Sequence, residues 1–225
     1  MVTDSIDNQI KSKERVQKHG EVNTNLREIN AMLDLVKDET LRIESKFLEP
    51  ACGDGNFLIE VLRRKKNIIK KNFSKTQHDF EKNTFIAITS IYGIDILEDN
   101  VTSCQERILD FILDDYNRSF KKTKNDDFIE SLKYVISKNI ILGDAITLKC
   151  QTNDLVSKPI IFSDWTMIGN GMIKRKDFIF SELVERSSMR EMPLFSDLDD
   201  EDQAFIPTPI KEYPLIDFLE IMNCE

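Results

Sequence analysis

The 225-residue sequence lacks any run of 18 apolar residues, and it has only two histidines and four cysteines. The first absence excludes a transmembrane helix. The cysteines form no CxxC pair and the histidines have no ligand partners at useful spacing, which argues against a zinc site and a disulfide framework. The polar, charged N-terminus predicts no secretory signal. We therefore expect a cytoplasmic protein with reduced thiols, no metal and no membrane partner.

Charge is distributed unevenly along the chain. The net charge is −9, yet residues 191–225 hold ten acids and one base, whereas residues 1–190 hold 30 acids and 30 bases. Four of the six prolines also lie in 191–225. This predicts one domain over residues 1–190 and an acidic, extended or disordered tail over residues 191–225, with a short helix near 215–222. The acidity therefore does not argue against nucleic-acid binding by the body, and the tail is a candidate for docking a protein partner.

Hydrophobic periodicity predicts strands that alternate with helices, which indicates an α/β fold with a parallel sheet and flanking helices. The expected helices cover residues 24–36, a stretch from 56, 77–89, a stretch after 99–100, and 126–137. The expected strands cover residues 46–49, 90–96, 139–142 and 159–162. A hairpin of residues 165–168 and 172–180, turned by Gly169-Asn170-Gly171, follows them.

Residues 47–58, with the sequence FLEPACGDGNFL, carry the most informative chemistry. The segment predicts a strand that ends in an acid, a tight glycine turn and the start of a helix. Gly53 and Gly55 would let backbone approach a ligand that side chains would block, and a helix N-terminus offers unpaired N–H groups. A GxG turn alone is also typical of a ligand-free connection, whereas the full string is more specific.

The full string resembles motif I of the adenine-N6 DNA methyltransferases of restriction systems, whose usual form is D-P-A-C-G-S-G-x-F. Glu49 replaces the usual Asp, and Asp54 replaces the usual Ser. The resemblance covers about residues 15–165. It implies a Rossmann-like sheet that binds S-adenosyl-L-methionine (SAM). The implied cofactor contacts in this motif are Glu49, Pro50, Ala51, Cys52, Gly53, Gly55, Asn56 and Phe57.

Three further segments resemble the family's motifs in the right order. Residues 19–24 resemble the upstream G-E-V-F-T-P element, which implies that Thr24 flanks the methionine end of SAM. Residues 93–96 (GIDI) resemble motif II, in which Asp95, followed by Ile96, would bond both ribose hydroxyls, because a carboxylate accepts two hydrogen bonds. Residues 143–145 resemble motif III, in which Asp144, followed by Ala145, would accept from the adenine amino group. Without the resemblance, both acids would be interpreted as strand-end caps.

The family's fourth motif, [DNS]-P-P-[YFW], is missing, because the sequence contains no Pro-Pro. The expected fourth strand runs instead into Ser163-Asp164-Trp165. In one interpretation Ser163 or Asp164 accepts from the target amino group while Trp165 stacks on a flipped base, which makes these residues the catalytic candidates. In the other, Trp165 is a core residue that opens the hairpin. Ser-Asp lacks the rigidity that two prolines give.

Other parts of the family's usual sequence are also missing from this sequence. The resemblance implies more strands and a target-recognition region, so we expect a sheet that is incomplete after the fourth or fifth strand, with specificity supplied by a separate chain. Residues 63–75 hold seven bases and no acid, which is typical of a solvated helix face and less so of a phosphate contact. Residues 174–176 (KRK) in the hairpin are the better candidate for DNA contact.

The sequence therefore predicts a SAM-binding DNA methyltransferase of restriction-modification type that acts on N6 of adenine. The alternative, motivated by the missing Pro-Pro and target region, is a non-catalytic SAM-binding or interaction subunit of a restriction-modification or phage-defence assembly. Transfer to RNA or to protein amides is a third interpretation.

Overall fold

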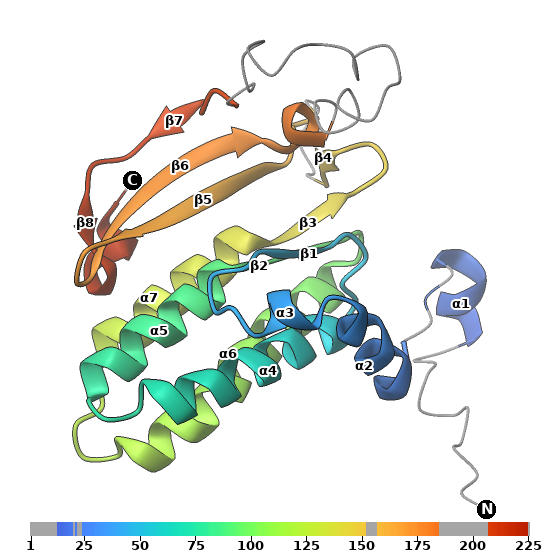
Figure 1. Cartoon of the computed structure of the whole chain (residues 1–225). Coiled ribbons are helices and arrows are strands. Elements are labelled where there is room, and N and C mark those ends of the chain that lie inside the picture. The colour runs from blue at the N-terminus through green and yellow to red at the C-terminus, as the bar shows by residue number, and fades with distance from the viewer. Residues whose placement is uncertain (1–12, 20, 22–23, 152–156, 185–206, 225) are drawn as a thin grey trace, which may run out of the picture.

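The computed structural model describes residues 13–19, 21, 24–151, 157–184 and 207–224. These residues form a mixed α/β fold. Figure 1 shows a small sheet with a group of helices on one side and a long β-hairpin on the other.

The first sheet has the order β1-β2-β3-β4. Its strands are β1 (Phe47–Glu49), β2 (Ile91–Asp95), β3 (Ile140–Asp144) and the short β4 (Lys149–Cys150). β1, β2 and β3 are parallel, and β4 is antiparallel to β3. Because parallel strands share one carboxyl edge, their last residues Glu49, Asp95 and Asp144 lie along the same edge of the sheet. The parallel strands predicted from the sequence are confirmed.

The helices α2, α4, α5, α6 and α7 follow the predicted pattern, and α5 has the predicted bounds, whereas α1 and α3 were not predicted. The helices are α1 (Lys13–His19), α2 (Leu26–Leu35), α3 (Lys37–Thr40), α4 (Asn56–Asn72), α5 (Gln77–Thr89), α6 (Glu98–Ser119) and α7 (Asp126–Asn139). Side-chain caps set several starts: Thr76 accepts from the Asp79 N–H and Asn125 from the Asp127 N–H. α2 is capped by Asn25, one residue after the expected Thr24.

The fourth parallel strand was predicted wrongly. Residues 161–168 form one continuous strand, β5 (Ile161–Ile168), which pairs antiparallel with β6 (Met172–Ile179) in a second sheet. No proline or glycine interrupts the chain at Ser163-Asp164, so the strand continues into the hairpin. The turn itself is confirmed, with positive φ at Gly169 (62°) and Gly171 (122°).

The hairpin crosses the first sheet instead of extending it. The chain entering β5 lies beside the carboxyl end of β3, where a Cβ on Gly143 would come within 2.8 Å of the Ile160 Cδ1. Farther along, the Tyr92 hydroxyl of β2 donates to the Ser163 carbonyl at 2.9 Å, and the Tyr92 ring packs edge-on against Phe162. β5 therefore passes over the sheet from β3 toward β1.

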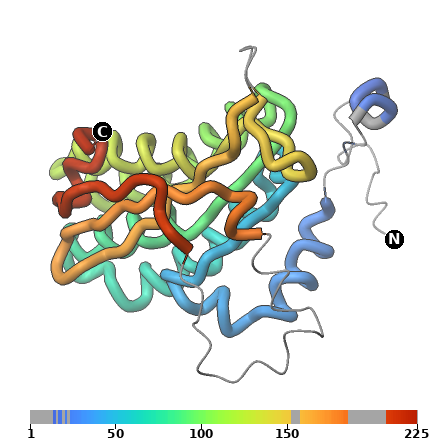
Figure 2. Tube along the Cα trace, turned by 90° about the horizontal axis from the view of Figure 1, so that it is seen from above, coloured from blue at the N-terminus to red at the C-terminus, as the bar shows by residue number. Residues whose placement is uncertain are grey.

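The C-terminal segment is part of this fold over residues 207–224. It forms β7 (Lys211–Glu212) and β8 (Ile216–Asp217), which both pair with β6, and the 3-10 helix η3 (Phe218–Asn223). Figure 2 shows it running along the hairpin. Phe218 and Ile221 are fully buried, and Phe218 packs against Phe85 of α5. The short helix is confirmed, whereas the expectation of a loose tail is wrong here because these apolar side chains enter the core; residues 191–206 lie outside the described part.

Four of the seven basic side chains in segment 63–75 are exposed, and the other three turn inward. Lys65 of α4 is fully buried, and its Nζ donates to the carbonyls of Ile43 (2.9 Å) and Ser45 (2.5 Å) and to the Ser90 hydroxyl (2.5 Å). Burial lowers the pKa of Lys65 to about 7. Lys66 lies over the Phe111 ring and pairs with Asp115 of α6 at 2.7 Å. The expected solvated face is therefore only partial.

Lys65 gives a test of this packing. Lys65→Met keeps the apolar stem but leaves buried carbonyls without their donor, so we expect it to lower the free energy of unfolding by about 3 kcal/mol. Urea unfolding followed by circular dichroism measures the change. Lys71→Met, on an exposed position of the same helix, is the matched control and should stay within about 0.5 kcal/mol. Equal effects of the two substitutions would contradict the buried role.

Candidate functional site

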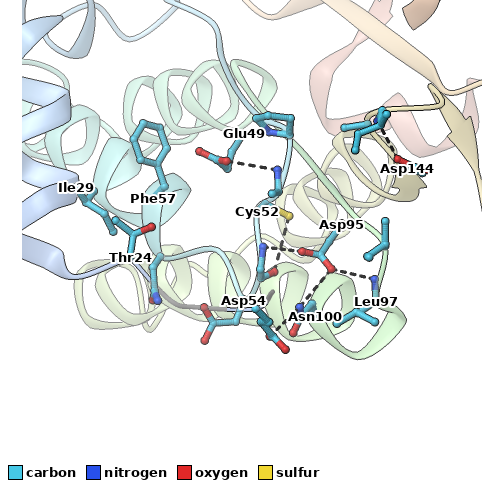
Figure 3. A pocket seen from close by; sticks show the side chains of 18 of the residues that line it. Thr24, Ile29, Glu49, Cys52, Asp54, Phe57, Asp95, Leu97, Asn100 and Asp144 are labelled. Carbon is cyan, nitrogen blue, oxygen red and sulfur yellow. Dashed lines mark hydrogen bonds between the residues drawn. The ribbon is translucent and has the colours of Figure 1, made fainter. Parts of the chain in front are cut away.

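A cavity of about 590 Å³ opens at the carboxyl edge of β1, β2 and β3. Figure 3 shows Asp144 on one side of it and Ile29 and Phe57 on the other. Its size is typical of a site for a small molecule or cofactor. All cofactor residues expected from the sequence line it, except Gly55: Thr24, Glu49, Pro50, Ala51, Cys52, Gly53, Asn56, Phe57, Asp95, Ile96, Asp144 and Ala145.

Other residues that line the cavity were not predicted from the sequence. These are Glu21, Ile29, Met32, Asp54, Leu97, Asn100, Ile146 and Gln151. Glu21 lay within the quoted upstream element, and Leu97 and Asn100 closely follow Asp95, so adjacency to a motif was an available signal for them. Gln151 carried no such signal, because only the turn between β3 and β4 brings it to the cavity.

The glycine turn between β1 and α4 is held by its backbone conformation and by packing. Gly53 and Gly55 have φ of 53° and 90°, which L side chains rarely adopt. A Cβ on Gly55 would lie 2.7 Å from the Cys104 Sγ of α6. A side chain at position 55 would therefore disturb the packing of α6 beneath the cavity, and the predicted role of Gly55 in the approach of a ligand stays a prediction. Cys52 is buried against Cys104, and this contact with its burial raises the pKa of the Cys52 thiol.

Asp95 connects the turn to the start of α6. One oxygen accepts from the Gly53 N–H at 2.9 Å, and the other accepts from the Leu97 N–H at 2.9 Å and the Asn100 side-chain amide at 3.2 Å. The residue is only 8% exposed. A carboxylate has about four lone-pair sites, so these three bonds occupy most of its capacity. Asp95 is thus a structural tie at the cavity wall, and its contact with a ribose stays a prediction.

Asp144 is oriented by the turn that follows β3. Its Oδ1 accepts from the N–H groups of Ile146 (2.8 Å) and Thr147 (3.3 Å). These bonds favour the ionised form and hold the pKa of Asp144 below its usual value. The carboxylate is therefore a charged acceptor at the rim of the cavity.

Glu21 joins the N-terminal helix to the same wall. It pairs with Arg15 of α1 and accepts from the Asn100 side-chain amide at 3.0 Å. Arg15 also donates to Asp99 in the first turn of α6 at 2.6 Å. These contacts run from Arg15 through Glu21 to Asn100, and they thus connect Asp95 to α1.

Glu49 differs from the other acids of the cavity. It is half-buried at the end of β1, and the Ala51 N–H approaches its Oε1 at 3.4 Å. Within the described part of the chain, no lysine or arginine pairs with it. Burial raises the pKa of Glu49 above its usual value. The cavity therefore contains one carboxylate whose charge is poorly compensated.

The catalytic candidates Ser163, Asp164 and Trp165 lie elsewhere. Asp164 pairs with Lys46, which precedes β1, and the Trp165 Nε1 donates to Asn139 Oδ1, just before β3, at 2.9 Å. These contacts place them toward the amino ends of the strands, whereas the cavity lies at the carboxyl ends. A five-residue strand spans about 17 Å. The structure thus does not bring the expected catalytic residues together with the expected cofactor residues.

Ser163 and the basic hairpin residues belong to a buried polar cluster. The Ser163 hydroxyl donates to Asp177 at 2.7 Å, and Arg175, 4% exposed, donates to the same carboxylate at 2.8 and 2.9 Å. The Arg175 guanidinium also lies over the Tyr213 ring. Arg175 is therefore not a surface contact for DNA.

The two lysines that flank Arg175 reach the surface but are paired. Lys174 and Lys176 each contact one oxygen of Glu212 in β7 at 3.1 Å, and these contacts hold the pKa of Glu212 below its usual value. The KRK segment is thus partly neutralised by the C-terminal segment.

The cavity lies at one edge of a parallel sheet and is bordered by a glycine turn and three acidic strand ends. This arrangement is consistent with a methyltransferase-like α/β domain. The family model described as "MmeI, DNA-methyltransferase domain" matches residues 21–170, about two thirds of the chain. The chain therefore belongs to this family of restriction-modification methyltransferase domains, and the family predicted from the sequence is confirmed. No curated protein and no solved structure matched the chain.

No helix among the described residues is both long and apolar enough to cross a membrane. No group of three or more His, Cys, Asp or Glu side chains in the same residues is arranged to hold a metal ion.

Because no lysine or arginine among the described residues pairs with Glu49, we expect that removal of its charge stabilises the folded protein. Because folding raises its pKa, the ionised carboxylate costs stability above the unfolded-state pKa, and this cost disappears at lower pH, where both states bind the proton. Glu49→Gln should therefore raise the melting temperature at pH 7.5 and not at pH 4. Differential scanning calorimetry at both values measures this, with exposed Glu106→Gln of α6 as the control. A lower melting temperature for Glu49→Gln at pH 7.5 would contradict the assignment.

Proposed function

We propose that this chain is a SAM-dependent DNA methyltransferase domain that acts on N6 of adenine. The observation that supports this most is the cavity at the carboxyl edge of β1–β3, where the motif residues meet. Membership of the MmeI DNA-methyltransferase domain family supports the reaction class. The choice of adenine rests on the motif resemblance.

The cavity fits SAM in both size and chemistry. α4 begins at Asn56, and its N-cap residue Gly55 offers no side-chain cap, so the first N–H groups of the helix are available to the carboxylate of the methionine part. Asp144 can accept from the adenine amino group, Asp95 has limited capacity left for a ribose hydroxyl, and Glu49 faces the cationic centre. Thr24 and Phe57 line the wall formed with α2.

SAM supplies a methyl group made electrophilic by its sulfonium. The residues of this chain bind and orient that group, and the apolar side chains of Ile29, Met32 and Phe57 exclude water from one wall. An amino nitrogen of the DNA base would accept the methyl group as the bond between the methyl carbon and sulfur breaks, which would leave a neutral thioether, and the amino proton would pass to water. Positioning of the two reactants supplies most of the rate enhancement in this proposal.

We propose structural roles for Ser163 and Trp165, since both are buried and hydrogen-bonded within the hairpin region. The proposal therefore assigns the target amino group no acceptor among these residues. DNA remains the expected substrate, with sequence specificity supplied by a separate chain.

SAM binding and transfer test the proposal directly. Isothermal titration calorimetry should detect SAM binding, and Asp144→Ala should weaken it about tenfold through loss of a charged acceptor, whereas Glu106→Gln should not. Tritium transfer from SAM to DNA, followed by nucleoside digestion, should yield N6-methyladenine. No binding up to millimolar SAM would refute the cofactor site. Label in cytosine would refute the choice of base, and a SAM binder that labels nothing would favour the non-catalytic alternative.

Trp165 separates the two interpretations of the missing Pro-Pro motif. Trp165→Ala removes a buried indole and its hydrogen bond to Asn139, so we expect a loss of about 3–5 kcal/mol in the free energy of unfolding. Trp165→Phe keeps most of the packing and should retain both stability and transfer. Urea unfolding and the tritium assay measure both. A Trp165→Ala variant that is fully stable, binds SAM and has lost transfer would instead show a catalytic role.

A further inference from the structure

Acidic side chains are frequent in the cavity wall. Among the described residues that line it, five are carboxylates and none is a lysine, arginine or histidine. A cavity of this kind has an electrostatic preference among ligands of similar shape and different charge.

Four of the five carboxylates are compensated by other groups of the protein. Arg15 pairs with Glu21, and Arg107 of α6 pairs with Asp54 at 2.7 Å. The carboxylates of Asp95 and Asp144 each accept at least two N–H donors from the loops that follow β1, β2 and β3. These contacts stabilise the four charges in the absence of a ligand.

Glu49 is the exception. It is half-buried, no basic side chain pairs with it among the described residues, and its one hydrogen bond is long, at 3.4 Å. A carboxylate in such a position is stabilised strongly by a cation that enters the cavity. The same charge contributes less toward a ligand that lacks a cationic centre at that position.

We propose that Glu49 is the residue by which this domain discriminates the charged methyl donor from its demethylated product. The proposal rests on the proposed function. SAM carries a sulfonium, an ammonium and a carboxylate, for a net charge of +1. S-adenosylhomocysteine keeps the last two groups and has a neutral thioether, for a net charge of zero. The two ligands therefore differ mainly in the charge that Glu49 can recognise, and transfer of the methyl group removes the attraction.

Calorimetric titration of the full chain with three ligands tests this proposal. The ligands are SAM, S-adenosylhomocysteine and sinefungin, in which a carbon bearing an ammonium replaces the sulfonium. We expect SAM and sinefungin to bind about tenfold more tightly than S-adenosylhomocysteine. Glu49→Gln should remove most of this difference by weakening the two cationic ligands, with the neutral one changed by less than about twofold.

Two further variants control the experiment. Glu49→Asp keeps the charge and should keep the preference, and Glu106→Gln removes a charge outside the cavity and should leave all three affinities unchanged. Equal binding of the three ligands to the unaltered chain, or equal losses for all three in Glu49→Gln, would overturn the assignment while leaving the cofactor site intact. Failure of all three to bind the unaltered chain would instead refute the proposed function.

Discussion

The carboxylate of Asp95 is the tie on which the rest of the site depends. It joins the Gly53 turn after β1 to the first turn of α6, and through Asn100 it extends to Glu21 and the N-terminal helix. A buried carboxylate that accepts from three N–H donors holds these donors in one geometry. Backbone and carboxylate contacts therefore hold this wall of the cavity together.

The hairpin illustrates a second constraint. Without prolines at Ser163-Asp164 the strand does not end there, and β5 continues over the sheet toward α7. Its alternate residues then enter a buried polar cluster around Arg175 and Asp177, which the C-terminal segment closes with Tyr213. The polar residues at the expected fourth motif therefore make their contacts within the fold.

In three parts of the structure, charged side chains are compensated by neighbouring groups. Lys65 and Lys66 of the basic segment are bound by carbonyls and an acid, Lys174 and Lys176 by Glu212, and four acids of the cavity by arginines or backbone N–H groups. Glu49 stands apart because, in the part of the chain that the structure describes, neither a basic side chain nor a short hydrogen bond offsets its burial. Its long-range electrostatic field is thus available to a ligand.

The sequence by itself determined the longer helices from α2 onward, the three parallel strands and most of the cavity wall. Periodicity, caps and the glycine turn act over a few residues, and parallel strands must bring Glu49, Asp95 and Asp144 to one edge. Only the tertiary structure decided that Gly55 makes room for Cys104, that Lys65 and Arg175 are buried, and that residues 207–224 pack against β6. It also decided that Ser163, Asp164 and Trp165 lie away from the cavity. These outcomes depend on which surfaces meet across long separations in the chain, and no local pattern of residues contains that information.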